Sequence, residues 1–301
     1  MPQSRLHPFP LLILCATLAG CASGMCGPEV KPEELPALEA QVKAHPTDSD
    51  LFTRLGIGYY AAKNWGRAHD ALQAAVSLDG RNYRATVYLG LTDEELGEFD
   101  SARVAYAAAR PLATSAARRT ELDDRLVLLT RREMVASAKL AIAQESTLSQ
   151  TPPEPNTVAV MPFHYAGADT SLAPLGRGLT QLVVNDLGQV ARLKLLERER
   201  VQALTDELKL ADEGRVDPAT AARSGRLLRA DQVVQGTLGD AGSPNDLRLD
   251  ANVVNTTTSQ VTATGSATDQ LQQLFDAEKN VVLQLLQRMG ITLTPAEQQS
   301  I

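Results

Sequence analysis

The chain has few aromatic side chains and few cysteines. Aromatic residues make up 4% of its 301 residues, so its cores must be built mostly from leucine, valine and alanine. The three cysteines, Cys15, Cys21 and Cys26, do not make a disulfide framework. We therefore expect the stability of the folded parts to rest on packing.

Clustered positive charge is also missing. The formal net charge is −7, from 29 lysines and arginines against 36 aspartates and glutamates, and acidic residues are in excess in both halves. Binding of nucleic acid selects clustered lysine and arginine, so this pattern argues against nucleic acid as a partner. The most basic stretch, residues 192–229, mixes both signs and indicates a solvated, ion-paired face.

An apolar run occurs at the N-terminus, and no later run is long enough for a transmembrane helix. Arg5 precedes the run at residues 9–18, and Ala19-Gly20-Cys21 follows it. This order is typical of a secretory signal and resembles the lipobox of bacterial lipoproteins. The resemblance implies cleavage before Cys21 and acylation of that cysteine. An ordinary signal peptide that ends near a cysteine is the alternative, and either one takes the mature chain out of the cytoplasm.

The residue after Cys21 indicates the membrane to which a lipoprotein is sorted. Ala22 stands there rather than aspartate, which by analogy with enterobacterial sorting favours the outer membrane. We expect the protein to be lipid-anchored on the periplasmic side, with the membrane reached through the lipid and the body of the chain soluble. The covalent lipid on Cys21 is the only added group that we expect.

The first half contains an internal repeat of 34 residues. Leu55-Gly56 recurs as Leu89-Gly90, and Ala68 and Ala75 recur as Ala102 and Ala109. This is the length of a tetratricopeptide (TPR) repeat, a pair of packed helices. The first copy resembles the family pattern at seven positions: Phe52, Leu55, Gly56, Tyr59, Ala68, Leu72 and Ala75.

Two copies, with a helix at 35–44 before them, are fewer than a solenoid usually needs. We expect the helix at 115–144 to pack on the last repeat as a cap. The TPR resemblance implies a peptide-binding concave face lined by the first helix of each repeat. The alternative is that these are ordinary helix residues covered by the cap. The positions of the face are Asp50, Thr53, Ile57, Tyr60, Arg84, Val87, Leu91 and Glu94.

The second half has the pattern of an α/β domain. A proline-rich linker at 146–156 precedes it. The apolar periodicities then alternate between strands and helices and end in three strands and a long amphipathic helix, which predicts a mixed sheet covered by helices. The strands are expected at 157–163, 192–196, 231–238, 247–253 and 261–265, and the helices at 175–190, 199–210, 218–228 and 269–289.

Several of these segments resemble a known family. VAVMPF, NDLGQVARLKLLERERVQALTDELKL, AARSGRLLRADQVVQGTL and LRLDANVVNTTTSQV are similar to the soluble domain of the curli-export lipoprotein family CsgG, whose architecture the N-terminal domain of TolB and LpoB share. The resemblance covers residues 157–290 and implies a periplasmic assembly or accessory role, with ring formation in some relatives. Pore-forming members carry long hairpins beside these strands, whereas only residues 239–246 lie between the strands at 231–238 and 247–253 here, so the sequence gives no basis for a pore.

No set of residues points to catalysis. His164 has no histidine or cysteine at ligand spacing, and Gly176-Arg177-Gly178 lacks the third glycine of a phosphate loop. The stretch 240–250 fails as a calcium loop because Pro244 stands where a ligand should be. We therefore predict that the protein is not an enzyme and that it binds no metal and no cofactor.

The predicted order of domains runs from a signal peptide at 1–20 and a lipidated tether at 21–34 to TPR-like repeats with their cap at 35–145. The linker at 146–156, a CsgG-like domain at 157–292 and a tail at 293–301 follow. The predicted function is that of a scaffold or accessory factor in envelope assembly or protein export. It would bind protein partners of the envelope and could form a homo-oligomer. The alternatives are a component of a CsgG-like secretion channel and a receptor for a small ligand near residues 164–178.

Overall fold

The computed structural model describes residues 30–210, 217–242 and 246–301. The chain divides into two compact units after Leu126, within a long helix, and each unit is described by itself. The predicted signal peptide and Cys21 lie outside the described residues. Whether residues 146–156 also separate two folding units, as the composition indicates, stays a prediction.

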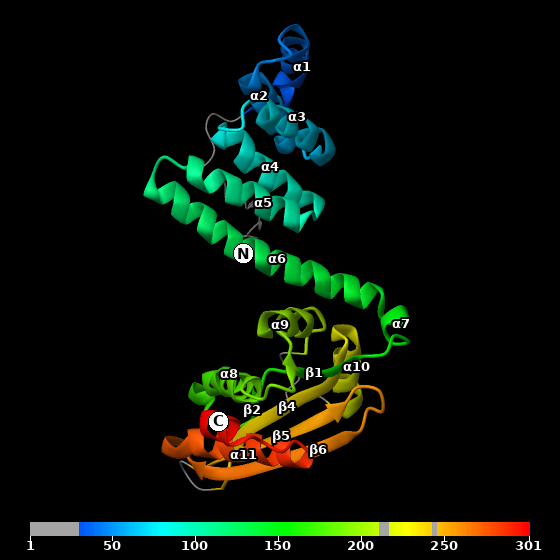
Figure 1. Ribbon diagram of the computed structural model, residues 1–301, viewed down its shortest axis with the longest axis vertical. Coiled ribbons are helices and arrows are strands. Elements are labelled where there is room, and N and C mark those ends of the chain that lie inside the picture. Colours follow the sequence, from blue (N-terminus) through cyan, green and yellow to red (C-terminus); the bar gives the residue numbers. More distant parts are fainter. Residues whose placement is uncertain (1–29, 211–216, 243–245) are drawn as a thin grey trace, which may run out of the picture. The chain divides into compact units, whose positions relative to one another are not determined.

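The first unit is all helical and contains two helical hairpins, seen in blue to green in Figure 1. One cap recurs with the repeat: Asp48 and Asn82, 34 residues apart, each accept a hydrogen bond from the backbone N–H three residues later, at the start of α2 and α4. Asn64 caps α3 in the same way, but Glu98, 34 residues after it, makes no side-chain cap on α5. The elements are η1 (Pro32–Glu34), α1 (Leu35–Ala44), α2 (Ser49–Ala61), α3 (Trp65–Leu78), α4 (Tyr83–Leu96), α5 (Phe99–Ala109), η2 (Arg110–Leu112) and the first part of α6 (Ala116–Ala143).

Glycines set the close approach of the two helices in each hairpin. A Cβ on Gly56 would lie 2.5 Å from Cγ of Leu72, and one on Gly90 would lie 2.7 Å from Cε1 of Tyr106. Both positions therefore require glycine, as the repeat pattern predicts. The small residues of the facing helices, Ala68, Ala75, Ala102 and Ala109, are fully buried.

The second unit is built around a mixed sheet, as the element order predicts. The strand order is β3-β1-β4-β5-β6, with β2 beside β4, and the pairs among β1 to β4 are parallel while β4, β5 and β6 are antiparallel. The strands are β1 (Glu154–Val160), β2 (His164–Tyr165), β3 (Lys194–Leu195), β4 (Ala230–Asp240), β5 (Asp246–Asn255) and β6 (Val261–Gln270). The helices are the rest of α6, α7 (Glu145–Leu148), η3 (Thr170–Leu172), α8 (Pro174–Gly188), α9 (Arg198–Glu207), α10 (Pro218–Leu228), η4 (Leu271–Gln273), α11 (Leu274–Arg288) and α12 (Pro295–Ser300).

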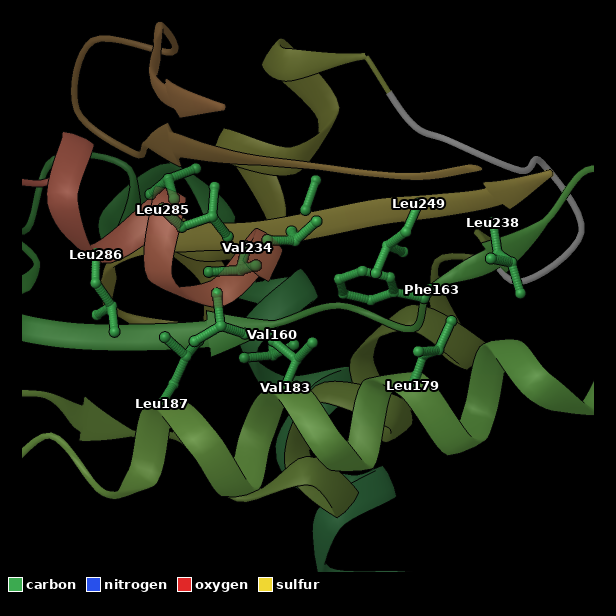
Figure 2. Close-up of a cluster of buried hydrophobic side chains, with 14 of the residues drawn as sticks. Val160, Phe163, Leu179, Val183, Leu187, Val234, Leu238, Leu249, Leu285 and Leu286 are labelled. Carbon is green, nitrogen blue, oxygen red and sulfur yellow. The ribbon is translucent and has the colours of Figure 1, made fainter. Parts of the chain in front are cut away.

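Helices cover both faces of this sheet. On one face, α8 and α11 pack against the odd-numbered residues of β5, and Figure 2 shows Leu179, Val183 and Leu187 of α8 directed at the strands. On the other face, α9, α10 and the end of α6 pack against Ala159, Val233 and Val254. The two cores are separate because successive side chains of a strand point to opposite faces.

The C-terminal part departs from its expected boundaries. The expected helix at 269–289 begins later, because β6 continues as a strand to Gln270 beside β5. Phe275, expected on the apolar side of that helix, is 62% exposed, because it lies in the first turn of α11 at the margin of the buried stripe. Residues 293–301 contain α12, opened by a capping box between Thr294 and Glu297, and Ile301 is buried.

Candidate functional site

The predicted concave face of the helical unit is mostly buried by its own chain. Asp50 is exposed, and Tyr60 and Arg84 are partly exposed. The other five positions have little accessible surface, with Val87 fully buried: Thr53, Ile57, Val87, Leu91 and Glu94. Of the eight positions, Asp50, Tyr60 and Arg84 are therefore accessible enough to contact a partner directly. Binding by this face stays a prediction.

Contacts between the two copies close the first part of this face. The amide nitrogen of Asn82, which caps α4, lies 2.9 Å from the hydroxyl of Ser49 and 3.0 Å from that of Thr53, both on α2. The Thr53 hydroxyl in turn donates to the carbonyl oxygen of Ser49. Thr53 thus joins two repeats and is not available to a peptide.

The first part of α6 covers the concave face of the second repeat, which is formed by α4 and α5. Arg125 forms a two-point ion pair with Glu94, with Nε 2.6 Å from Oε1 and Nη2 2.9 Å from Oε2, and the Tyr106 hydroxyl donates to the same carboxylate at 2.5 Å. The Arg118 guanidinium also lies over the Tyr83 ring, at 5.1 Å. Burial raises the pKa of Tyr106, and the Glu94 charge adds to it, so the phenol remains a proton donor. These contacts are those expected of a capping helix.

An aromatic cluster stands at the accessible end of the face. The Tyr60 ring lies 5.1 Å from the Trp65 ring and 5.6 Å from the Tyr88 ring, in tilted and edge-on geometries. Tyr88 is buried, whereas Tyr60 and Trp65 are partly exposed. Exposed tyrosine and tryptophan anchored by buried neighbours are typical of the energetically dominant part of protein interfaces.

The repeat pattern indicated Tyr60 as a surface position but did not indicate Trp65 or Tyr88. Trp65 is the single tryptophan of a chain with few aromatic residues, and this could have marked it as a candidate binding residue. Tyr88 comes from the next repeat, 28 positions after Tyr60, so its contact with Tyr60 depends on the stacking of the two hairpins.

In the α/β unit, the region near His164 is a packed helix entry. A Cβ on Gly176 would lie 2.4 Å from the carbonyl oxygen of Phe163, and the Thr180 hydroxyl accepts a hydrogen bond from the Phe163 N–H at 2.8 Å. Gly176 is therefore needed for the close packing of α8 against the backbone of Phe163. In the part of the chain that the structure describes, no cluster of three or more histidine, cysteine or acidic side chains could hold a metal.

A groove runs between the second part of α6 and α9. Its volume is about 630 Å³, its floor is mostly apolar, and charges of both signs stand around it. A cavity of this size is within the range that binds small ligands. The lining residues are Val127, Thr130, Arg131, Met134, Val135, Arg198, Glu199, Gln202, Ala203 and Asp206. Sequence reasoning missed the groove because the two helices lie far apart along the chain.

Residues 139–242, from the end of α6 to the end of β4, match the sequence model of the CsgG family, described as "Curli production assembly/transport component CsgG". This match confirms the family resemblance that the sequence segments indicated. No curated protein matches the chain. Of the helices within the described residues, none is both long and apolar enough to cross a bilayer.

Solved structures of bacterial lipoproteins also match. The C-terminal domain of LpoB from Salmonella enterica is 12% identical over 46% of this chain and 98% of its own length, with a TM-score of 0.31. Lipoprotein GNA1162 from Neisseria meningitidis is 15% identical over 40% of this chain and 91% of its own, with a TM-score of 0.32. The C-terminal domain of LpoB from Escherichia coli is 12% identical over 42% and 95%, with a TM-score of 0.29.

Proposed function

We propose that this protein is a non-catalytic accessory lipoprotein of the bacterial envelope. It is anchored to the outer membrane through Cys21 and faces the periplasm. The helical unit binds a protein partner, and the CsgG-like unit docks on, or assembles within, a complex for envelope assembly or export. The family match over residues 139–242 carries this proposal, because its description is of assembly and transport rather than of a reaction.

The partner surface that we propose is the accessible end of the concave face. Tyr60 and Trp65 offer aromatic area that is already oriented by the buried Tyr88, so little side-chain entropy is lost on binding. Arg84 lies one helical turn before Tyr88 on α4 and adds a positive charge, and Asp50, in the first turn of α2, adds a negative charge farther along the face. This combination suits a partner segment with an apolar anchor and polar flanks rather than a uniformly charged one.

Recovery of the partner from native membranes tests the surface. Tyr60→Ala combined with Arg84→Ala should lower recovery of co-purified protein roughly tenfold or more, since truncation of an interface anchor commonly costs above 1 kcal/mol. The matched control is Val104→Ala combined with Arg81→Ala, which changes two exposed side chains of the same unit and should leave recovery unchanged. Melting curves of both variants check that the unit is folded. Equal recovery with the two variants would contradict the proposed surface.

The anchor is tested separately. Cys21→Ala should abolish incorporation of labelled palmitate and move the protein from the membrane fraction to the soluble fraction, because only acyl chains hold the body to the bilayer. Cys26→Ala is the control and should change neither. Labelling that persists in Cys21→Ala would disprove the lipid site without bearing on the partner surface.

A further inference from the structure

β6 forms one edge of the sheet. Within the described residues, β5 is the only strand beside it, so one side of this ten-residue strand has no strand neighbour. Such an edge presents backbone N–H and C=O groups that can pair with a strand of another molecule. Natural sheets usually protect an edge with charges, proline, bulges or a covering element.

The β6 sequence itself carries little protection. Residues 261–268, VTATGSAT, contain no charged residue and no proline, and threonine and valine favour strands. Thr264, Ser266 and Thr268 are exposed on the face opposite α11. Two such strands could pair antiparallel without bringing like charges together, so the partner that this edge fits best is β6 of a second copy.

Two side chains of α11 occupy the middle of this edge. Ser266 donates its N–H to Oε1 of Gln284 at 3.2 Å, and Nε2 of Gln284 donates to the Ser266 carbonyl oxygen at 3.1 Å. The Gln284 carboxamide thus makes the same pair of hydrogen bonds that a residue of an added antiparallel strand would make. One helical turn later, Arg288 donates to the carbonyl oxygen and the hydroxyl of Thr264.

The backbone of β6 is shaped to allow this. Ser266 and Thr264 are two residues apart, so their backbone groups point to the same side of the strand, away from β5. Between them lies Gly265, where a Cβ would be 2.9 Å from the carbonyl oxygen of Val281. The missing side chain lets α11 approach closely enough for Gln284 and Arg288 to reach around the edge.

We infer that Gln284 and Arg288 are an edge guard, which closes β6 against pairing with β6 of a second copy of this chain. The guard is part of the folded unit and needs no other molecule. Removing it exposes three hydrogen-bonding backbone groups within residues 261–268, the uncharged part of β6.

The test uses the mature full-length chain with Cys21→Ala, to avoid detergent. This Cys21→Ala chain is the parent. Adding Gln284→Ala and Arg288→Ala should make the weight-average mass in sedimentation velocity rise with concentration, toward twice the mass of the parent. The control, Gln287→Ala combined with Arg177→Ala, removes an exposed glutamine and an exposed arginine and should behave as the parent. Adding Ser266→Lys to the guard variant places a charge on the edge strand and should restore the parental profile.

Two results would overturn the inference. One is an unchanged mass profile for the guard variant at every concentration, and the other is association that persists with Ser266→Lys. Hydrogen exchange on the parent gives an independent check should the variant fold poorly. The Ser266 amide should exchange more slowly than the Thr268 amide, which lies on the same side of the strand, and equal rates would rule out the guard.

Discussion

Replacing Arg125 by alanine should lower the free energy of unfolding of the helical unit by about 3 kcal/mol. The change leaves the Glu94 carboxylate, whose side chain is fully buried, without its two charge-assisted hydrogen bonds. Breaking one partner of a buried pair costs about 3 to 5 kcal/mol, and the lower end applies because the Arg125 side chain is 28% exposed. Urea unfolding followed by circular dichroism measures the loss.

An exposed ion pair between η2 and α6 provides the control for this prediction. Arg110 and Asp123 form an ion pair of similar geometry, with Nε 2.8 Å from Oδ1, but both side chains are about half exposed. Arg110→Ala should therefore cost much less stability than Arg125→Ala, because water screens an exposed ion pair. A double change, Arg125→Met with Glu94→Leu, should recover only part of the stability, because it removes the unpaired charge but leaves the buried Tyr106 hydroxyl without its acceptor. Equal losses for Arg110→Ala and Arg125→Ala would show that the Glu94 network does not stabilise the cap.

The features that the sequence predicted are those that depend on neighbours along the chain. The repeat located both hairpins because Gly56 and Gly90 must be small where Leu72 and Tyr106 press against them. The strands of the second unit were visible because one set of alternate residues, such as Leu249 and Val253, is fully buried. The CsgG family model matches residues 139–242, which contain three of the four segments that indicated the resemblance.

The features that it missed depend on contacts between distant segments. Burial of Val87 and Glu94 could not be read from the TPR pattern, because it depends on neighbouring helices and, for Glu94, on Arg125 at the start of α6. β2 has two residues, too few to show alternation, and exists only through its pairing with β4. The apolar periodicity of α11 likewise predicted its buried face, but not the hydrogen bond that Gln284 accepts from the Ser266 N–H of β6.

The α/β unit should lose stability as the pH rises from about 4.5 to about 8. Burial raises the pKa of Glu278 from its ordinary value to about 8, and the charge of Asp186 on α8 adds to the shift, while Lys279 opposes it. A carboxyl whose pKa is higher in the folded state binds more protons there, so its contribution is complete below pH 4.5 and is lost by about pH 8. We expect a loss of roughly 3 to 5 kcal/mol, measured by urea unfolding at pH 5, 7 and 9.

Glu278→Gln separates this carboxyl from every other titrating group of the unit. Glutamine keeps the size of the protonated side chain and can still donate to Asp186, so at pH 5 the variant should be nearly as stable as the parent. At pH 9 it should be more stable, because Glu278 is 1% exposed and its ionised form has to be desolvated beside Asp186. Asp276→Asn, at an exposed position of α11, should follow the parent at each pH. A constant difference between Glu278→Gln and the parent across this range would mean that the Glu278 carboxyl is already ionised in the folded protein.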